Sequence, residues 1–306
     1  MRVLVTGASG FVGTWLTREL RTSGHAASAF PSHDRVDLTD AGAIAAVIRA
    51  KAPDVVAHLA AVSFGPDATR DPALAFRVNV GGTLALCEAL RAQSDPPILL
   101  VAGSSDVYGS PELRDLPLTE AASLRPRSAY GLSKAAQEAV ALEAASRQGL
   151  RVVVARAFNH TGPGQRDVFV VPALARRVAA LKRGDAAEIP VGNLEVRRDF
   201  TDVRDVVRAY RLLMELGSDG RIGDRGGSVV NVASGRSVSI RSLLLDLCRM
   251  AQVEPRMMVD PSLVRPDDPP DIVGDASALR ALTGWTPLVP WPQTLAEVLA
   301  EAAGRG

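Results

Sequence analysis

The stretch Gly7-Ala-Ser-Gly10-Phe-Val-Gly13, which directly follows the apolar run Val3–Thr6, decides the fold of this chain. A turn that brings backbone N–H groups close to a pyrophosphate has no room for side chains at the closest positions. Gly7, Gly10 and Gly13 meet that need, and the N-terminus of the following helix adds its partial positive charge. We therefore predict a dinucleotide-binding turn between a first strand and a first helix. The alternative is a glycine-rich turn without a ligand.

Short apolar strands alternate with amphipathic helices through the first half of the chain. The pattern predicts strands over 3–6, 26–30, 55–59, 98–102 and 152–155, and helices over 11–23, 41–52, 72–92 and 128–147. Strands that are apolar throughout and separated by helices indicate a parallel sheet covered on both faces. Crossovers in such sheets are nearly always right-handed. The predicted fold class is α/β, with a Rossmann-type doubly wound parallel sheet.

The regularity loosens after Gly162-Pro-Gly164. We predict helices over 169–183, 203–216, 239–251 and 294–302, strands near Ile189 and over 229–232, and a charged loop over 195–199. These elements indicate a smaller α/β C-terminal substrate lobe. The expected domains are 1–163, which binds the dinucleotide and receives some later segments, and 164–306, which mainly holds the substrate.

Bulk properties exclude several classes of protein. With 35 basic and 34 acidic residues the net charge is +1, so nothing global recruits nucleic acid or an anionic membrane. Cys87 and Cys248 have apolar neighbours and no ligand-spaced companions, which predicts reduced core residues and no metal site. The chain begins in a strand without a leader, and we see no stretch near the ~20 apolar residues of a membrane span. We expect a cytoplasmic protein.

The end of the second strand bears on which nicotinamide dinucleotide fits. An acidic residue there would accept from the ribose hydroxyls of NAD and would repel the 2′-phosphate of NADP. Here the strand ends Phe30-Pro-Ser32-His33, and Ser32, His33 and Arg35 could receive a phosphate. The sequence therefore favours NADP(H), while the nearby Asp34 leaves NAD(H) possible.

Tyr130-Gly-Leu-Ser-Lys134 is a candidate chemical site. Tyr130 and Lys134 are four residues apart, so on a helix they share one face. A nearby ammonium favours the phenolate, so we expect it to lower the tyrosine pKa from about 10 and to make Tyr130 a proton donor or acceptor. Ser104 follows the fourth strand, where it could hydrogen-bond the same substrate oxygen. The alternative is a packed tyrosine beside a solvated lysine.

The order of the glycine turn and the Tyr-x-x-x-Lys pair resembles the short-chain dehydrogenases/reductases of the extended type, the NAD-dependent epimerase/dehydratase family. The resemblance implies that Lys134 also hydrogen-bonds the nicotinamide ribose, that Asn79 lies near the catalytic group, and that His58 is followed by cofactor-contacting residues. The residues implied to bind the cofactor are Gly7, Ser9, Gly10, Phe11, Val12, Gly13, Ser32, Asp37, Leu38, Leu59, Ala60, Ala61, Tyr130 and Lys134.

Asp106, in Ser104-Ser-Asp-Val-Tyr-Gly109, bears on the reaction. Sugar dehydratases of this superfamily place a glutamate at this position to move a proton from C5. Here an aspartate, one methylene shorter, takes its place, and such a change can displace a base by an amount that matters for proton transfer. Asp106 is therefore a catalytic candidate, or it orients a sugar hydroxyl, and dehydration is disfavoured.

Four segments of the second half resemble the GDP-sugar branch of this family, above all its GDP-4-keto-6-deoxy-D-mannose reductases. They are Arg156-Ala-Phe-Asn-His-Thr-Gly-Pro-Gly-Gln165, Val191-Gly-Asn-Leu-Glu195, Arg198-Asp-Phe-Thr-Asp-Val-Arg-Asp205 and Val264-Arg-Pro-Asp-Asp-Pro269. Arginines suit the two phosphates of a nucleotide diphosphate, because the guanidinium fork matches phosphate oxygens. The implied substrate-binding residues are Ser105, Asn159, Asn193, Leu194, Arg198, Arg265 and Asp268.

The resemblance implies that the C4 ketone of a GDP-4-keto-6-deoxy sugar is reduced to give GDP-D-rhamnose, and that the chain forms a homodimer through the helices over 72–92 and 128–147. An epimerase or a GDP-mannose 4,6-dehydratase on the same scaffold remains open, as does a dinucleotide-binding sensor without catalysis. Which sugar face receives hydride, and so rhamnose or 6-deoxytalose, is not determined by the sequence.

Overall fold

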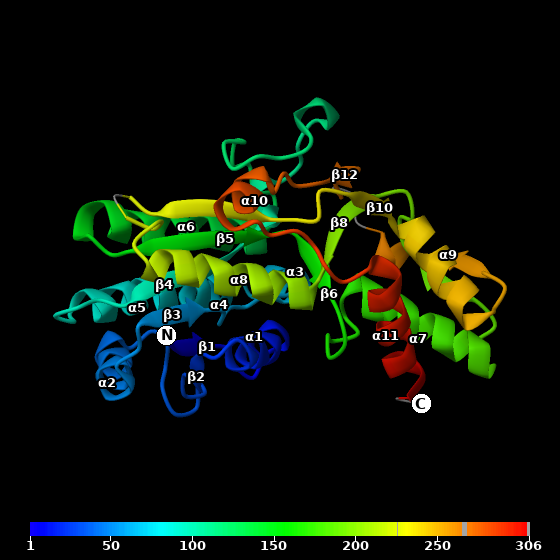
Figure 1. Ribbon diagram of the computed structural model, residues 1–306. Helices are drawn as coiled ribbons and strands as arrows, with labels where there is room; N and C mark the ends of the chain where they lie inside the picture. The colour runs from blue at the N-terminus through cyan, green and yellow to red at the C-terminus, as the bar shows by residue number, and fades with distance from the viewer. Residues whose placement is uncertain (225, 265–267, 305–306) are drawn as a thin grey trace.

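The computed structural model describes residues 1–224, 226–264 and 268–304. Its larger part is a six-stranded sheet in which every neighbouring pair is parallel and the order is β2-β1-β3-β4-β5-β9 (Figure 1). The strands are β1 (Arg2–Thr6), β2 (Ala26–Ala29), β3 (Val55–His58), β4 (Ile98–Ser104), β5 (Val152–Ala157) and β9 (Ser228–Val232). The predicted doubly wound parallel sheet is confirmed.

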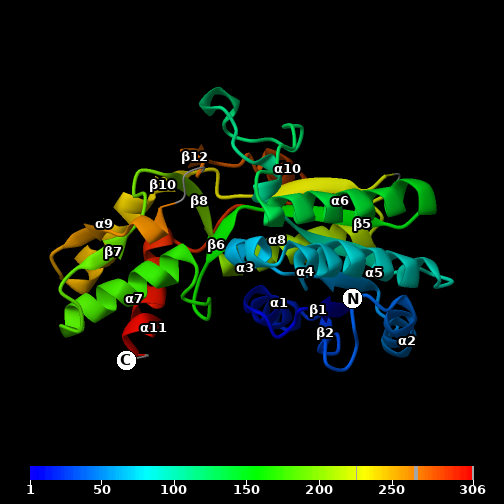
Figure 2. The same cartoon turned by 180° about the vertical axis from the view of Figure 1, so that it is seen from behind.

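Helices cover both faces of this sheet. On one face lie α1 (Phe11–Thr22), α8 (Val203–Ser218) and α10 (Ser277–Thr283); on the other lie α2 (Ala41–Lys51), α5 (Gly82–Arg91) and α6 (Ala129–Gln148) (Figures 1 and 2). Side chains alternate between the two cores along each strand. Val3 and Val5 pack with α1 and α8, whereas Leu4 packs with α2 and α5. Burial on both faces explains why the central strands are mostly apolar.

The predicted helix over 72–92 is one helical run with a wider turn inside it. It consists of α4 (Pro72–Phe76), the π-helical turn η1 (Arg77–Gly81) and α5, after the short helix α3 (Gly65–Arg70). By length and composition Pro72–Arg91 is apolar enough to cross a membrane, so the expectation that no stretch comes near a span is wrong. Half of its most apolar window is buried, and α5 packs against α2 and α6, as core helices that pass the same test do.

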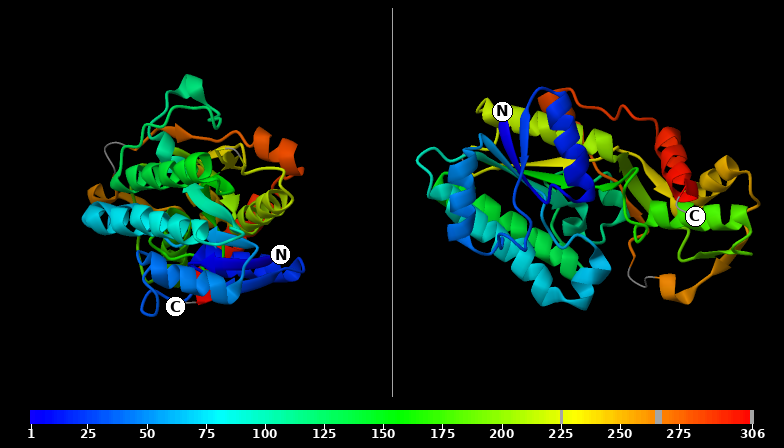
Figure 3. Two further views of the ribbon diagram at one scale, coloured as in Figure 1. Left: turned by 90° about the vertical axis from the view of Figure 1, so that its left-hand side faces the viewer. Right: turned by 90° about the horizontal axis from the view of Figure 1, so that it is seen from below.

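A smaller lobe extends from one end of the sheet (Figure 3). Its first sheet has the order β10-β8-β12, with β6 also paired to β8, and its second pairs β11 with β7. Helices α7, α9 and α11 share one core with β7, β8, β10 and β11. The elements are β6 (Asn159–Thr161), α7 (Val170–Arg183), β7 (Ile189–Val191), β8 (Arg197–Asp202), β10 (Ser237–Ser239), α9 (Ile240–Ala251), β11 (Met257–Val259), β12 (Asp271–Ile272) and α11 (Trp291–Gly304). The residues that the structure describes also form three 3-10 turns, which are η2 (Ser105–Tyr108), η3 (Leu113–Asp115) and η4 (Pro261–Leu263).

The second half of the chain contains a strand where a loop was predicted, and two segments that belong with the large sheet. The charged loop predicted over 195–199 is wrong in part, because Arg197–Asp202 forms the central strand β8 of the small lobe. Its polar side chains hid the strand from a prediction based on sequence. Asp199 is fully buried and accepts hydrogen bonds from the backbone of Ser234 and Gly235, whereas a charged residue usually indicates a loop. Second, α8 and β9 belong to the large sheet, as expected of later segments that return to it.

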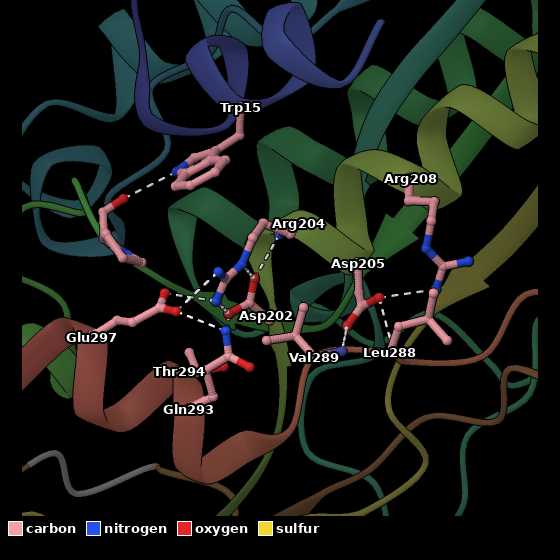
Figure 4. A network of polar contacts seen from close by, with 11 residues as sticks. Trp15, Asp202, Arg204, Asp205, Arg208, Leu288, Val289, Gln293, Thr294 and Glu297 are labelled. Atoms are coloured by element: carbon pink, nitrogen blue, oxygen red, sulfur yellow. Dashed lines mark hydrogen bonds and ion pairs between the residues drawn. The ribbon is translucent and has the colours of Figure 1, made fainter. Parts of the chain in front are cut away.

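A buried polar network joins the C-terminal helix to the large domain (Figure 4). Arg204 at the start of α8 binds Asp202 through two nitrogen atoms, at 2.8 Å each, and also reaches Glu297 of α11. Thr294 donates to the same Asp202 carboxylate at 2.7 Å. Arg204 also lies over the Trp15 ring of α1. The small lobe is thus fixed to two helices of the large domain.

Candidate active site

The glycine turn after β1 has the shape of a dinucleotide cradle. Gly7 has φ +68°, and a Cβ there would lie 2.9 Å from the Ala60 nitrogen. A Cβ at Gly13 would lie 2.1 Å from the Gly7 carbonyl oxygen, so α1 can approach the turn this closely only with glycine. No acidic side chain stands in the first turn of α1, whose N-terminus keeps its partial positive charge. The turn fits the pyrophosphate of a dinucleotide.

The other expected cofactor residues lie around this cradle. Ser9 and Gly10 are exposed at the tip of the turn, and Phe11 and Val12 are half-buried at the start of α1. Leu59, Ala60 and Ala61 follow β3, the neighbour of β1 in the sheet. The backbone nitrogens of Leu59 and Ala60 both donate to the Thr6 hydroxyl, at 3.1 Å each. The two strand ends are therefore held together at the point where the strand order reverses, where such sheets bind ligands.

The segment after β2 carries a mixed set of charges. Ser32 hydrogen-bonds Asp34, which lowers the pKa of that carboxyl. Asp37 accepts from the nitrogen and the hydroxyl of Thr39, at 2.8 Å each, and these bonds hold its pKa below the ordinary value. Leu38 is half-buried against the core. Arg77, in the π-helical turn, also lowers the Asp37 pKa, and is a nearby cation that the sequence did not single out.

Ser104 and Tyr130 meet at the carboxyl end of β4. Ser104 is the last residue of β4, and its oxygen accepts from the Asp106 nitrogen at 3.2 Å. Tyr130 is the second residue of α6, which begins at the Ser128 N-cap. A side-chain hydrogen bond with Ser104 connects the two. The structure thus brings together the predicted acid–base tyrosine and the predicted hydroxyl donor.

The expected lowering of the Tyr130 pKa is wrong, because the protein's own side chains raise that pKa. Burial and the negative charge of Asp106 raise that pKa, and the hydrogen bond with Ser104 only partly offsets them. The Lys134 ammonium is instead engaged with Ala102 and Gln137. With a raised pKa the phenol is neutral near pH 7, which suits a proton donor.

Lys134 is buried beneath this pair. Its ammonium donates to the Ala102 carbonyl at 2.5 Å and to the Gln137 side chain. Burial lowers the Lys134 pKa to about 8, while the charge of Glu138 acts in the opposite direction. An ammonium has three N–H donors, so within the described part of the chain one is left for a ligand.

An ion pair anchors α6 on the sheet. Arg156 of β5 and Glu138 of α6 are both buried, and the Arg156 Nε lies 2.9 Å from a Glu138 carboxylate oxygen, with a second contact from Nη2. The Arg156 Nη1 donates to the Tyr108 hydroxyl at 2.9 Å and to the Glu120 carbonyl at 3.1 Å. The pair fixes the helix that carries Tyr130 and Lys134.

Asn79, which the resemblance places near the catalytic group, lies inside the protein. It is fully buried in the π-helical turn, where its Oδ1 accepts from the Val62 nitrogen at 2.8 Å and its Nδ2 donates to Ser133 on α6 at 2.9 Å. Turns of this kind often occur at functional sites. Asn79 connects the loop after β3 to the helix of Tyr130.

The expected substrate residues lie along the junction with the small lobe. Ser105 is buried at the start of η2 and Asn159 opens β6, next to β5. Asn193 is exposed, whereas the Leu194 side chain lies in the core of the small lobe. The Arg198 guanidinium binds the Asp268 carboxylate. The two expected ligands thus pair with each other, and Arg265 lies outside the described residues.

A cavity of about 350 Å³ opens beside the loop that follows β3, at the same junction. Phe64 and Arg166 line it; Phe64 meets Phe169 edge-on, with ring centroids 5.3 Å apart, and Arg166 lies over both rings. The sequence did not single out these three residues, since nothing local marks a contact between distant loops. In the described part of the chain, no group of three or more His, Cys, Asp or Glu side chains could hold a metal ion.

Comparisons with known proteins agree with this geometry. The sequence model of the NAD-dependent epimerase/dehydratase family matches residues 3–233. GDP-6-deoxy-D-mannose reductase from Pseudomonas aeruginosa is 38% identical over 99% of this chain and 98% of its own. GDP-6-deoxy-D-talose 4-dehydrogenase from Aggregatibacter actinomycetemcomitans is 29% identical over 93% of this chain and 92% of its own. A solved structure of RMD from Pseudomonas aeruginosa, complexed with NADPH, superposes with a TM-score of 0.89, at 37% identity and 100% coverage of both chains.

Proposed function

Because the chain belongs to the NAD-dependent epimerase/dehydratase family, we propose that it is an NADPH-dependent reductase of a GDP-linked 4-keto-6-deoxy sugar, with GDP-4-keto-6-deoxy-D-mannose as substrate and GDP-D-rhamnose as product. The observation that carries the proposal is the meeting of Tyr130, Ser104 and Lys134 at the carboxyl end of β4, on the same edge of the parallel sheet as the glycine turn after β1. The full-length similarity to a GDP-6-deoxy-D-mannose reductase supports the sugar.

The cofactor residues proposed are those of the cradle and of the loop after β3. The glycines of the turn leave room for the pyrophosphate, and the free N–H of Lys134 suits a ribose hydroxyl. The similarity to a structure complexed with NADPH supports NADP(H), in line with a β2 that ends without an acid. When bound, the nicotinamide supplies the hydride.

In the proposed chemistry, Tyr130 holds the proton that the sugar oxygen needs. Its raised pKa keeps the phenol protonated at neutral pH, and this proton would go to the C4 oxygen while C4 receives the hydride that a bound nicotinamide would supply, which together convert the ketone to an alcohol. The Ser104 hydroxyl, already beside the phenol, stabilises the charge that develops on the same oxygen. Asp106 orients a sugar hydroxyl, and its negative charge favours the neutral phenol.

Deuterium transfer tests this proposal. Enzymatically prepared GDP-4-keto-6-deoxymannose, incubated with NADPH labelled at the nicotinamide C4, should yield a GDP-deoxyhexose with deuterium at its C4. Nuclear magnetic resonance of the product then distinguishes rhamnose from 6-deoxytalose. Conversion of GDP-mannose to a keto-sugar without added cofactor would instead identify a GDP-mannose 4,6-dehydratase.

We further propose that the chain forms a homodimer through α5 and α6. A groove of about 500 Å³ runs between these helices, and Leu84 and Leu132 remain 46% and 49% exposed on them. Pairing two copies would cover these apolar side chains. Leu84→Glu should convert a dimer to a monomer in sedimentation experiments, and a monomeric wild-type protein would refute the pairing.

A further inference from the structure

His58 is a buried titratable residue that the proposed chemistry does not use. It lies at the end of β3 with 1% of its surface exposed, and both ring nitrogens have partners. Nδ1 is 2.9 Å from the Thr6 hydroxyl, and Nε2 is 3.0 Å from the Thr83 hydroxyl. These contacts join the cofactor cradle to the interior of the sheet.

The partners of Thr6 allow one protonation state of this histidine. A hydroxyl has one donor and two acceptor positions. The Thr6 oxygen already accepts from the nitrogens of Leu59 and Ala60, so its own hydrogen must point to Nδ1 of His58. Nδ1 therefore carries no proton, and the hydrogen of the neutral ring is on Nε2. Burial agrees, because it lowers the His58 pKa to about 3.

The hydrogen bonds of Thr83 likewise determine the orientation of the Gln137 side chain on α6. Its hydroxyl donates to the Asn79 carbonyl at 2.7 Å, which leaves the oxygen to accept from His58 Nε2 and from Gln137 Nε2, the latter at 2.9 Å. With the Gln137 nitrogen directed to Thr83, its oxygen faces Lys134 and accepts from the ammonium. Each hydrogen bond in this network, which connects Thr6, His58, Thr83, Gln137 and Lys134, thus has one assigned donor and one assigned acceptor.

We propose that Gln137 is a positioning residue that fixes the Lys134 ammonium, held in its orientation by Thr83 and neutral His58. The inference rests on the proposed function insofar as Lys134 serves the cofactor. Gln137 and the Ala102 carbonyl take two N–H groups of Lys134, so the third has a set direction. This hydrogen-bonded network is a fixed scaffold and not a proton relay, because His58 cannot accept a second proton without losing the hydrogen bond that Thr6 donates to it.

Two substitutions at Gln137 shift the alkaline limb of the pH profile in opposite directions. Gln137→Met removes the acceptor, so the buried ammonium should lose its proton at lower pH and kcat/KM should fall about 10- to 100-fold. Gln137→Glu sets a carboxylate against Lys134, which should move the limb to higher pH. The titratable groups around Lys134 are neutral His58, Tyr130, Glu138 with its partner Arg156, and Asp106 beside Tyr130.

Gln93→Met, whose native amide bonds to the Ala89 carbonyl at the end of α5, is the matched control and should leave the limb in place. A merely structural Gln137 would lower thermal stability without moving the limb, and a limb that stays at the wild-type pH in both variants overturns the proposal.

A second measurement is independent of turnover. Nitrogen chemical shifts of His58 in the intact protein should show the Nε2–H tautomer, and the ring should stay neutral from about pH 6 to about pH 9. An Nδ1–H tautomer or a protonated ring in that range overturns the network. If the wild-type protein binds NADPH but reduces no keto-sugar, the proposed function fails, while this readout and the pH dependence of NADPH affinity still decide the role of Gln137.

Discussion

Loss of the Arg156 guanidinium should destabilise the protein through the partner it leaves behind. Arg156 and Glu138 are 4% and 3% exposed, and two nitrogen atoms of Arg156 contact the Glu138 carboxylate. In Arg156→Met the side-chain volume is nearly kept, but the buried Glu138 carboxylate loses the cation that it binds directly, while the Lys134 charge still acts on it. Removing one partner of a buried pair costs about 3–5 kcal/mol.

A double variant separates the effect of the ion pair on stability from the effect of side-chain packing. In Arg156→Met/Glu138→Leu neither charge remains, and replacing a whole buried pair by apolar residues is often neutral or stabilising. We expect the double variant to recover most of the loss, so that the two substitutions are strongly non-additive. The Tyr108 hydroxyl and the Glu120 carbonyl also lose the Nη1 donor, so recovery should stop short of the wild-type value.

The cost of Arg156→Met should depend on pH. Without its cation, buried Glu138 should have a folded-state pKa above its unfolded value of about 4.3. The folded state then binds more protons than the unfolded state between these two values, so the free energy of unfolding falls as pH rises through them. The variant should be closest to wild type below about pH 4.3 and furthest from it at neutral pH.

Urea unfolding followed by circular dichroism over this pH range measures both effects. A loss under about 1 kcal/mol at pH 7, or a double variant as unstable as the sum of the single variants, would refute the assignment of the pair as the anchor of α6.

Tyr130→Phe should lower kcat/KM about 10²- to 10⁴-fold while NADPH affinity, measured by fluorescence titration, stays near wild type; full activity would remove Tyr130 as proton donor. The kcat/KM of the wild type should fall above about pH 8, where Lys134 loses its charge and Tyr130 is still neutral. A fall that begins several pH units higher would contradict the role of Lys134. Thr294→Val removes the hydroxyl that donates to buried Asp202, and should cost about 1 kcal/mol in urea unfolding; an unchanged midpoint would show that Arg204 alone satisfies the carboxylate. Gly13→Ala should abolish NADPH binding or folding, since its Cβ would lie 2.1 Å from the Gly7 oxygen, and normal binding would contradict the cradle.

The large sheet could be predicted from the sequence because its strands are buried on both faces. Residues 3–5 and 152–155 are apolar throughout, and glycine, proline and N-cap residues such as Asp40 mark where the helices between strands begin and end. The same reasoning failed at β8. That strand carries Arg197, Arg198 and Asp199, whose partners lie far away in the sequence, so no local pattern distinguishes it from a charged loop.

The candidate site was predictable where one local motif carries it. Tyr130 and Lys134 share a helix, so their spacing alone indicates a common face. The raised Tyr130 pKa could not be predicted, because it depends on Asp106 and on burial against elements from other parts of the chain. The chain of contacts through His58, Thr83 and Gln137 was invisible for the same reason: it joins three elements that only the fold brings together.

The most direct test of the proposed function is the near-ultraviolet absorbance of NADPH mixed with the protein and GDP-4-keto-6-deoxymannose. The account predicts loss of the NADPH signal in a one-to-one ratio with formation of a GDP-deoxyhexose, and no such loss when the keto-sugar is omitted. An unchanged NADPH signal, with GDP-mannose converted to a keto-sugar without added cofactor, would contradict it.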